Sequence, residues 1–422
     1  MTDIWNYTVF YGDSIDSLKA CLRAGEPLKA EEVASTEGGL LIAAAYIDKH
    51  SPRIQEELMG HLEGTVSSLP KSELKVVGPI CVETSNPVVW MFPGQGAQRV
   101  DLLKGLYRRS QTFRDTLNRH LEAASDETGE NFLEALYPKE GANEETELRL
   151  TKTSVCQPVM LGLTLALSKV FELHGLRCAG AMGHSLGEFA AVAALGGIGE
   201  SEVMRFVATR GHLMVTSLEG QDTGAMAAIM APAETVSDAL VDSDKSVVLA
   251  NMNQPKQTVI SGPTKAIEAT VKTLRRARLP GKKIAVSHAF HSPLMAAAAI
   301  ALRPEIEKLS FRDLDAPVFS AIKAAPLTKA IELRDMFREH AESPVRFIDA
   351  LRLAAGAEKD RPIFVEMGPG KTLSSFARYT LGEETIAIES TSMSEDGEAG
   401  LVDAIIALVN LGIPIAHGLL DD

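Results

Sequence analysis

The chain has 422 residues, of which 45% are hydrophobic and 23% charged, a composition typical of a globular protein with a substantial core. Its 56 acidic residues outnumber its 42 basic ones, which gives a formal net charge of −14. Because such a charge repels phosphates on average, the composition disfavours nucleic acid and anionic membranes as main partners.

The cysteines give no sign of a metal site or of a disulfide framework. Cys21, Cys81, Cys156 and Cys178 are far apart and form no C-x-x-C pair. The N-terminus lacks a secretory pattern, and no apolar run approaches the roughly 18–20 residues that would span a bilayer. We therefore expect reduced thiols, a cytoplasmic location and no metal ion.

The N-terminal segment, residues 1–87, predicts a small α/β unit. Tyr7–Tyr11 is typical of a strand, and Ser14–Ala24 has helical spacing with a serine at its start. Gly39–Ala45 is apolar, and Pro52–Leu69 has the pattern of an amphipathic helix. A polar stretch then marks a boundary before the next strand.

The central part of the chain alternates strands with helices. Val88–Phe92 is a short apolar strand that ends in the glycine-rich turn Pro93–Gln98. A long apolar helix follows at Val155–Leu173, then a strand at Cys178–Met182 and a helix at Phe189–Leu195. This alternation favours a parallel sheet that is covered by helices on both faces.

An α+β insertion is predicted over residues 220–283. Ala225–Met230, Val247–Ala250 and Thr258–Ser261 are typical of strands, and Lys265–Arg278 of an amphipathic helix. The chain then returns to the main body.

The last part of the chain contains one further predicted strand and a final helix. Pro362–Met367 is apolar and ends in the glycine loop Gly368–Gly370. The acidic stretch Ser394–Gly400 predicts a loop before a helix at Leu401–Leu411.

A G-x-S-x-G motif, Gly183–Gly187, lies between a predicted strand and a predicted helix. This is the arrangement of a nucleophile elbow, in which Ser185 is exposed at a sharp turn. The helix N-terminus adds free backbone N–H groups that stabilise a developing oxyanion. A serine that merely caps the helix fits the same letters, and the motif does not say whether water or a second carrier accepts the acyl group.

A serine nucleophile needs a base, and the chain has ten histidines. His288 and His291 lie in the loop that closes the insertion, and the sequence alone does not choose between them. His184 is expected to point away from the serine, and His212 lies in the helix after the elbow. The remaining six are expected at the surface: His50, His61, His120, His174, His340 and His417.

Five segments, in this order and spacing, carry a family resemblance. They are FPGQGAQ (Phe92–Gln98), GHSLGE (Gly183–Glu188), ANMNQPKQTVISG (Ala250–Gly262), HAFHSPLM (His288–Met295) and EMGPGKTL (Glu366–Leu373). Together they resemble the malonyl-CoA:acyl-carrier-protein transacylase family, including acyltransferase domains of polyketide synthases, over about Val88–Ser390.

The resemblance implies a fold class and a division into domains. It implies an α/β fold in which an α/β-hydrolase-like core with a parallel sheet covers residues 88–219 and 284–392. A small ferredoxin-like α+β subdomain would cover 220–283, a ketosynthase–acyltransferase-type α/β linker 1–87, and a C-terminal segment 393–422. We interpret the chain as an acyltransferase domain with its linker from a type I polyketide synthase, which would place a ketosynthase nearby. A discrete trans-acting acyltransferase with an N-terminal extension is the alternative.

The resemblance also implies roles for site residues. Ser185 would be the nucleophile and His291 the base. A backbone carbonyl of Ser343–Phe347 would orient the imidazole in place of an acidic residue. The backbone N–H groups of Gln95 and Leu186 would form the oxyanion hole.

Two positions bear on the substrate. Arg210, about 25 residues beyond the serine, matches the family arginine that binds the malonyl carboxylate, for which a guanidinium offers two parallel N–H bonds. A surface arginine in a salt bridge is the other interpretation. Phe290 belongs to the HAFH form that accompanies malonyl, whereas a YASH form accompanies methylmalonyl. Leu186 and His288 are further selectivity candidates.

The implied reaction uses malonyl-CoA as the donor and the phosphopantetheine thiol of an acyl carrier protein as the acceptor, with no bound cofactor. Methylmalonyl or acetyl transfer, a serine thioesterase or esterase, and a non-catalytic scaffold are the alternatives.

Lys272–Lys283 is the densest basic segment and a candidate docking surface, although a solvated helix face fits it too. Glu188 is expected in the first turn of the elbow helix, where a carboxylate suits the dipole. Asn251 and Asn253 fit either hydrogen bonds near the site or strand-end turns.

Overall fold

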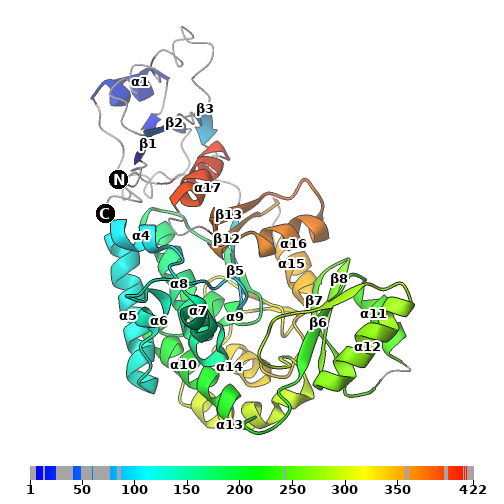
Figure 1. Cartoon of the computed structure of the whole chain (residues 1–422). Helices are drawn as coiled ribbons and strands as arrows, with labels where there is room; N and C mark the ends of the chain where they lie inside the picture. The colour runs from blue at the N-terminus through cyan, green and yellow to red at the C-terminus, as the bar shows by residue number, and fades with distance from the viewer. Residues whose placement is uncertain are drawn as a thin grey trace.

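The computed structural model describes residues 6–12, 15–24, 41–48, 59, 77–82, 87–241, 244–356, 361–393, 398–411, 413 and 415. The strands of these residues form three sheets, which Figure 1 shows with the four-stranded sheet at one side of the six-stranded one. Several sequence-based predictions lie outside the described residues: the histidines at 50, 61 and 417, the start of the loop at 394, and the helix at 52–69 apart from residue 59.

The largest sheet has six strands in the order β11-β10-β5-β4-β12-β13. Their bounds are β4 (Val88–Phe92), β5 (Gly180–Gly183), β10 (Val318–Ser320), β11 (Ala325–Leu327), β12 (Ile363–Pro369) and β13 (Ala387–Thr391). Neighbouring strands are parallel except that β11 runs antiparallel to β10. The predicted parallel sheet is therefore correct except at this edge, where a connection of four residues permits only antiparallel pairing.

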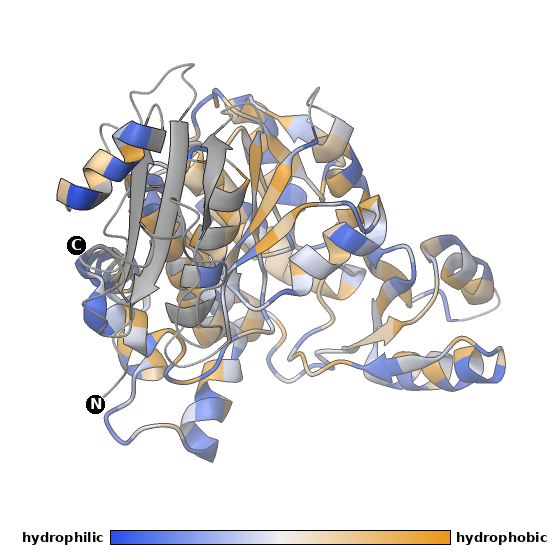
Figure 2. Cartoon of the chain, turned by 90° about the horizontal axis from the view of Figure 1, so that it is seen from above, coloured by the Kyte–Doolittle hydropathy of each residue, from blue (hydrophilic) through white to orange (hydrophobic). Residues whose placement is uncertain are grey.

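Helices cover both faces of this sheet. They are α4 (Lys104–Arg109), α5 (Gln111–Thr128), α6 (Phe132–Leu136), α7 (Glu144–Thr151), α8 (Thr153–Leu173), α9 (Gly187–Ala194), α10 (Glu200–Thr216), α13 (Ala296–Glu307), α14 (Ala330–Glu339), α15 (Phe347–Gly356), α16 (Thr372–Leu381) and α17 (Glu398–Asn410). The pair α8 and α9 and the pair α15 and α16 each pack together against the sheet. The connection from β4 to β5 and the connection from β12 to β13 run in opposite directions along the sheet. Because such connections are right-handed, their helices pack on opposite faces, and the two pairs therefore lie on opposite faces of the sheet. Figure 2 shows hydrophobic strands in the interior of the molecule.

Helix α8 is apolar throughout, as the sequence predicts for Val155–Leu173. It has 21 residues, and an 18-residue window within it has a mean hydropathy of 1.4, so it meets the length and composition of a membrane span, contrary to the expectation that no apolar run is long enough. However, 89% of its apolar window is buried inside the protein. We therefore describe it as the core helix of the body, on which α5 and α10 pack.

The insertion forms a separate antiparallel sheet in the order β7-β8-β6-β9. Its elements follow each other as β6 (Ala225–Ile229), α11 (Ala233–Leu240), β7 (Val248–Gln254), β8 (Gln257–Gly262), α12 (Thr264–Arg276) and β9 (Gly281–Lys283). It has its own apolar core, which includes Ile229, Ile260 and Leu274. Three strands and α12 were predicted; α11 and the three-residue β9 were not, since both are short.

Strand β7 of this smaller sheet pairs with the segment that follows α14. The backbone N–H of Met252 donates to the carbonyl of Val345 at 2.9 Å, and Val345 N–H donates to the carbonyl of Ala250 at 2.8 Å. Where the chain returns to the body, Ala289 N–H donates to the carbonyl of Thr223 at 2.8 Å. The smaller sheet is thus tied to the body by backbone hydrogen bonds beside the loop that carries the candidate histidines.

The N-terminal strands β1 (Asn6–Gly12), β2 (Leu41–Asp48) and β3 (Val77–Val82) form a three-stranded antiparallel sheet. Helix α1 (Ile15–Ala24) follows β1, in agreement with the predicted strand and helix. Helix α17 contacts both β3 and β13, so the C-terminal helix joins this sheet to the six-stranded one (Figure 1).

Candidate active site

Ser185 lies at a sharp turn between β5 and α9 and has a positive φ of 50°. A side chain on either flanking glycine has no space: a Cβ at Gly187 would lie 2.0 Å from the carbonyl oxygen of Phe92, and one at Gly183 would lie 2.0 Å from the carbonyl carbon of Gly187. Both glycines of the motif are therefore required by close packing of the turn. The elbow predicted from the sequence is present.

His291 is the histidine that the fold brings to this serine. Its Nε2 lies 2.7 Å from Ser185 Oγ, and its Nδ1 lies 2.8 Å from the carbonyl oxygen of Ser343. Because a carbonyl only accepts, Nδ1 carries the proton and Nε2 is left to accept from the serine hydroxyl. Burial is the main factor that lowers the pKa of His291 to about 3, so the ring is neutral near pH 7. The sequence left His288 and His291 open, and His288 instead lies near the hydroxyls of Thr153 and Ser287.

Two backbone N–H groups beside the serine have no acceptor among the described residues. Leu186 follows Ser185 at the start of α9, and Gln95 lies in the turn after β4. Neither N–H donates a hydrogen bond within that part of the chain. The two turns are adjacent because β4 and β5 pair in the sheet and His184 N–H donates to the carbonyl of Phe92 at 2.9 Å.

Arg210 of α10 is buried near the serine. Its Nη1 donates to Gln157 Oε1 at 2.5 Å, its Nη2 donates to His340 Nδ1 at 3.3 Å, and its guanidinium lies 5.1 Å from the centre of the Phe189 ring. Desolvation lowers its pKa to about 9, which still leaves it charged at pH 7. No described carboxylate pairs with this side chain, so the salt-bridge interpretation of Arg210 is wrong. A buried charge without an anion is costly, which makes this position suited to an anionic ligand.

The selectivity candidates surround the same region. Phe290 is half-buried and packs against two apolar groups, one containing Met214 and Met295 and the other Met226. Its ring centre lies 5.7 Å from that of His288, which is buried. The side chain of Leu186 is buried in the core of the body.

Three histidines that were predicted at the surface are buried: His120, His174 and His340. His120 Nε2 contacts Glu200 at 3.0 Å, and His174 Nδ1 donates to the carbonyl of Val170 at 2.7 Å. His340 reaches the site, where it contacts Arg210 as above and where its Nε2 lies 3.0 Å from the carbonyl oxygen of Ser185. The missed signal is helical spacing, because Leu333, Met336 and Phe337 recur on the buried face of α14 and His340, directly after the helix, continues this spacing.

His184 points away from the serine, as expected. Its Nε2 lies 2.7 Å from Asn253 Oδ1, and its ring packs against Phe347 at 5.4 Å and Phe376 at 6.3 Å between ring centres. Asn253 thus bonds directly beside the elbow, whereas Asn251 forms a backbone bridge to Val345. Both open interpretations hold for Asn253, since its Oδ1 bonds to His184 beside the elbow while its Nδ2 donates to Gln257 Oε1 at 2.9 Å across the turn after β7.

Two glutamates of the recognised segments are buried and hold backbone N–H groups. Glu188 accepts from the N–H groups of Ala321 and Ile322, the latter at 3.1 Å, and burial raises its pKa to about 7. It lies in the first turn of α9 as predicted, but it anchors the turn after β10. Glu366 of β12 accepts from the N–H of Ser374 at 2.8 Å at the start of α16. The segment EMGPGKTL therefore has a structural role through Glu366.

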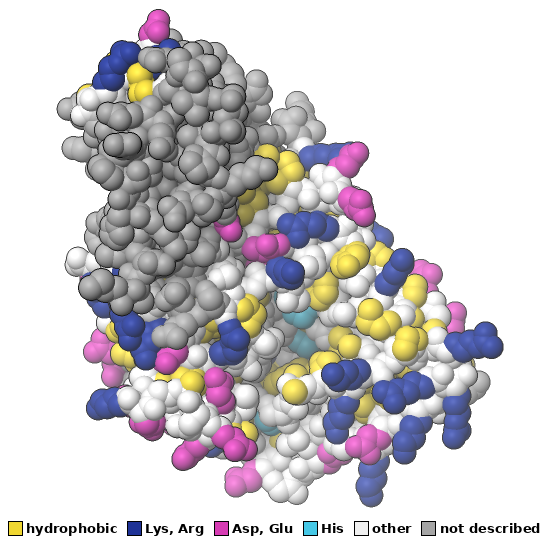
Figure 3. Space-filling model, turned by 45° about the horizontal axis from the view of Figure 1, so that its top comes forward, with side chains coloured by type: hydrophobic (Ala, Val, Ile, Leu, Met, Phe, Trp, Pro, Cys, Tyr) yellow, Lys and Arg dark blue, Asp and Glu magenta, His cyan; other side chains and the backbone are white. Residues whose placement is uncertain are grey.

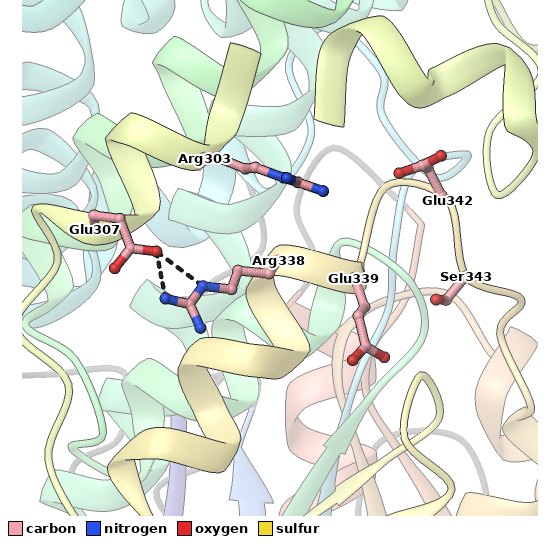
Figure 4. Close-up of a pocket in the computed structure, with 6 residues that line it drawn as sticks. All are labelled: Arg303, Glu307, Arg338, Glu339, Glu342 and Ser343. Atoms are coloured by element: carbon pink, nitrogen blue, oxygen red, sulfur yellow. Dashed lines mark hydrogen bonds and ion pairs between the residues drawn. The ribbon is translucent and has the colours of Figure 1, made fainter. Parts of the chain in front are cut away.

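A polar cavity of about 550 Å³ lies at the segment whose Ser343 carbonyl contacts His291. Figure 4 shows its lining residues, Arg303, Glu307, Arg338, Glu339, Glu342 and Ser343. Arg338 is paired with Glu307 at 2.6 Å, whereas Arg303 forms no ion pair with a described residue. Ser343 lines the cavity and also supplies the carbonyl that holds His291.

The basic segment Lys272–Lys283 lies on α12, the following turn and β9. Lys272, Arg276, Arg278 and Lys282 are exposed. Arg275 instead donates to the carbonyl of Gly281 at 2.8 Å. Figure 3 shows Lys and Arg side chains gathered on this side of the molecule, next to a hollow that contains histidine side chains.

Within the described residues, no three His, Cys, Asp or Glu side chains gather as metal ligands. Cys21, Cys156 and Cys178 are free thiols. Burial raises the pKa of Cys156 and of Cys178 to about 12, so both remain protonated near neutral pH.

The chain is similar to known acyltransferases. Residues 89–401 match the family model described as an acyl transferase domain. The chain is 33% identical over 301 residues to the malonyl CoA-acyl carrier protein transacylase of Bacillus subtilis, which covers 69% of this chain and 89% of that protein. It is 30% identical over 354 residues, 79% of this chain, to one component of the polyunsaturated fatty acid synthase of a Thraustochytrium species, of which the match spans only 12%. Among solved structures, the acyltransferase domain from the second module of the salinomycin polyketide synthase superposes with a TM-score of 0.75 at 27% identity, covering 95% of this chain and 87% of that one.

Proposed function

The chain belongs to the acyl transferase domain family, and we propose that it moves a malonyl group from malonyl-CoA through Ser185 to the phosphopantetheine thiol of an acyl carrier protein. The observation that carries this proposal is the buried Arg210, which has no described carboxylate partner and lies in the same site as the Ser185–His291 pair. A serine–histidine pair alone serves hydrolases as well as transferases. A buried cation beside it selects an acyl group that ends in a carboxylate.

In the first half-reaction, His291 Nε2 accepts the proton of the Ser185 hydroxyl while Oγ attacks the thioester carbonyl of malonyl-CoA. The negative oxygen that forms is stabilised by the backbone N–H groups of Gln95 and Leu186. The intermediate then expels CoA, and the thiolate takes the proton from His291. A malonyl ester on Ser185 remains.

In the second half-reaction, the carrier thiol gives its proton to His291 and attacks the ester carbonyl. The bond from the carbonyl carbon to Ser185 Oγ breaks, and His291 returns the proton to the serine oxygen. The carbonyl of Ser343 holds the Nδ1 proton throughout, so the ring accepts and donates only at Nε2. No acidic third residue and no resident cofactor enters this sequence.

Malonyl is preferred here over methylmalonyl and acetyl. The Phe290 ring is half-buried beside His288. A bulky ring next to the α-carbon of the acyl group would leave little space for an added methyl group, which supports rejection of methylmalonyl. Acetyl lacks the carboxylate that compensates the charge of Arg210.

The decisive experiment is the intact mass of the protein after mixing with malonyl-, methylmalonyl- or acetyl-CoA, with Ser185→Ala as the control. We expect a malonyl adduct on the wild type and none on the variant. Adding a carrier protein with its phosphopantetheine arm should then move the mass to the carrier. Hydrolysis that outpaces transfer in the presence of the carrier would instead support a thioesterase.

We infer that the chain divides as its three sheets suggest. A hydrolase-like core would take 88–219 and 284–392, and a ferredoxin-like subdomain 220–283, whose β-α-β-β-α-β order and strand order support this name. Residues 1–87 would be the linker to a ketosynthase in a polyketide synthase, and 393–422 a C-terminal segment that contains α17.

The carrier protein is the proposed protein partner. Carrier proteins are usually acidic, so the exposed basic side chains between Lys272 and Lys283 support docking there despite the net charge of −14. Charge reversal at Lys272 and Arg276 should raise the KM for the carrier while leaving the rate of the malonyl-CoA half-reaction unchanged. The free thiols Cys21, Cys156 and Cys178 support a cytoplasmic location.

A further inference from the structure

His340 connects the two functional parts of the site. It follows the last residue of α14 and is buried. One ring nitrogen, Nε2, lies 3.0 Å from the carbonyl oxygen of Ser185, and the other, Nδ1, lies 3.3 Å from Arg210 Nη2. The ring also stacks on Phe189, with 4.3 Å between ring centres. One side chain thus contacts both the residue that carries the nucleophile and the arginine proposed to bind the carboxylate.

The partners of His340 fix its tautomer. A guanidinium only donates, so Nδ1 must accept from Arg210, and a carbonyl only accepts, so the Nε2 proton is donated to Ser185. Both bonds are made by a neutral ring and by only one of its two neutral forms. Burial, followed by the charge of Arg210, lowers the pKa of His340 well below its usual range. The ring therefore remains in this form near neutral pH.

The two side chains that accept hydrogen bonds from Arg210 are uncharged. Gln157 holds Nη1 and His340 holds Nη2, while the Phe189 ring lies 5.1 Å from the guanidinium. These groups fix the plane and position of the guanidinium without neutralising it. A carboxylate at either position would form an ion pair and compete with a substrate carboxylate. The arrangement holds the arginine still and leaves its charge for the substrate.

The bond to Ser185 acts on a strained residue. The φ of 50° is an uncommon conformation for serine, and such conformations persist only where surrounding contacts hold them. The Ser185 carbonyl accepts from Glu188 N–H at 2.8 Å as well as from His340. The second bond comes from a residue 155 positions away, so it ties the elbow to the segment after α14.

The same short segment supports the base. Its outward side chains, Glu339, Glu342 and Ser343, line the cavity of Figure 4. The carbonyl of Ala341 accepts from His291 N–H at 3.2 Å, and that of Ser343 holds His291 Nδ1. The residues that directly follow His340 are thus held against His291, and the buried ring of His340 forms a rigid connection between the elbow and Arg210.

We propose that His340 is a positioning residue that sets Arg210 at a fixed place relative to the Ser185 hydroxyl, so that preference for carboxylate-bearing acyl groups depends on it. The proposal rests on the proposed function, because it concerns how the same site selects malonyl. It assigns His340 no proton transfer and no direct contact with the reacting atoms.

The test compares wild type, His340→Gln and His340→Phe with malonyl-CoA and acetyl-CoA, following adduct formation on Ser185 by intact mass. Glutamine offers one acceptor and one donor, so it should preserve the malonyl preference within a few-fold. Phenylalanine keeps the stacking on Phe189 but loses both polar contacts. We expect it to reduce the malonyl-to-acetyl ratio of kcat/KM by about tenfold, the size of one lost bond to a charged group, mainly through a higher KM for malonyl-CoA.

Two results would overturn the proposal: equal loss with both substrates in His340→Phe, or a glutamine variant as unselective as the phenylalanine one. Should His340→Phe not fold, as judged by circular dichroism, His340→Asn is used, since its amide is too short to bridge both partners and should show the same loss of preference. Failure of the proposed function itself is distinguishable, because the wild type would then form no malonyl adduct on Ser185.

Discussion

His291 and Ser343 are joined through a hydrogen bond of 2.8 Å from a ring nitrogen to a backbone carbonyl, where a serine hydrolase of the triad type has a carboxylate. The carbonyl fixes the tautomer of the ring but adds no negative charge beside it. In the proposed reaction, an imidazolium at His291 would therefore be less stabilised than in a triad and would return its proton readily to the leaving group.

Loss of the base is expected to abolish acylation. His291→Ala should slow formation of the malonyl adduct by about 10³-fold or more, since the serine hydroxyl loses its proton acceptor. His212→Ala, on the exposed side of α10, is the control and should react at the wild-type rate. Rapid-quench mass spectrometry measures both. If His288→Ala were the more damaging of the two changes in the HAFH loop, the assignment of the base would be wrong.

Loss of the guanidinium should change substrate preference more than stability. Arg210→Ala is expected to reduce kcat/KM for malonyl-CoA by about 100-fold, or roughly 2.8 kcal/mol for two charged hydrogen bonds, with acetyl-CoA unaffected or improved. Arg205→Ala, an exposed position on the same helix, is the matched control. Steady-state kinetics with both donors decides. An equal decrease with both donors would show that Arg210 is only structural.

A smaller side chain at Phe290 should admit a branched extender. Phe290→Ser removes the ring that packs between the two apolar groups around Met214 and Met226. We expect the ratio of methylmalonyl to malonyl adduct to rise by about tenfold in a competition with equal donor concentrations. The melting temperature of the variant is recorded alongside. An unchanged ratio in a folded variant would mean that the ring does not border the α-carbon.

The buried histidines should make the fold acid-sensitive. Burial lowers the pKa values of His184, His291 and His340 below the usual 6.5, that of His291 to about 3. Below pH 6.5 the unfolded chain takes up protons that the folded chain excludes, so the free energy of unfolding should fall as the pH decreases from 6.5 toward 4. Urea unfolding at several pH values measures this slope. His340→Gln removes one such group and should flatten the slope; an unchanged slope would contradict the assignment.

Glu188 should give the free energy of unfolding the opposite pH dependence. Its folded pKa of about 7 lies above the ordinary 4.5, so its contribution to stability is present below pH 4.5 and is lost as the pH rises through 7. Glu188→Gln keeps the acceptor for Ala321 and Ile322 and should remove this dependence. Glu188→Ala should cost about 2–4 kcal/mol, because two buried N–H groups lose their acceptor. The exposed Glu122→Gln serves as the control, and an unfolding free energy of Glu188→Ala equal to that of wild type would refute the anchoring role.

The predicted elements are those with a strong apolar pattern, whereas α5, α14, α15 and α16 were not predicted even though α5 has 18 residues. Val88–Phe92 agrees residue for residue with β4, and the apolar run at Val155–Leu173 lies within α8. The antiparallel β11 and the three-residue β9 were missed, since pairing direction and short strands are set by neighbouring strands and leave little periodic pattern.

The site likewise contains features that the local sequence predicts and contacts that it does not predict. The elbow at Ser185 is a local feature, which a strand, a turn and a helix specify together. The contacts of His340 join positions 130 and 155 residues apart, and those of Asn253 and Gln157 also cross between elements. Such pairs arise from packing, so only the buried-face spacing of α14 pointed toward His340, and it did not name a partner.

The pairing of β7 with Val345 has a practical consequence for building hybrid proteins. Val345 lies two residues after Ser343, whose carbonyl contacts His291, so the smaller sheet and His291 share one short segment. A smaller sheet taken from another protein and placed between residues 219 and 284 would arrive without the segment that it pairs with. Grafts that carry 339–345 along with the insertion are the ones we expect to keep their chemistry.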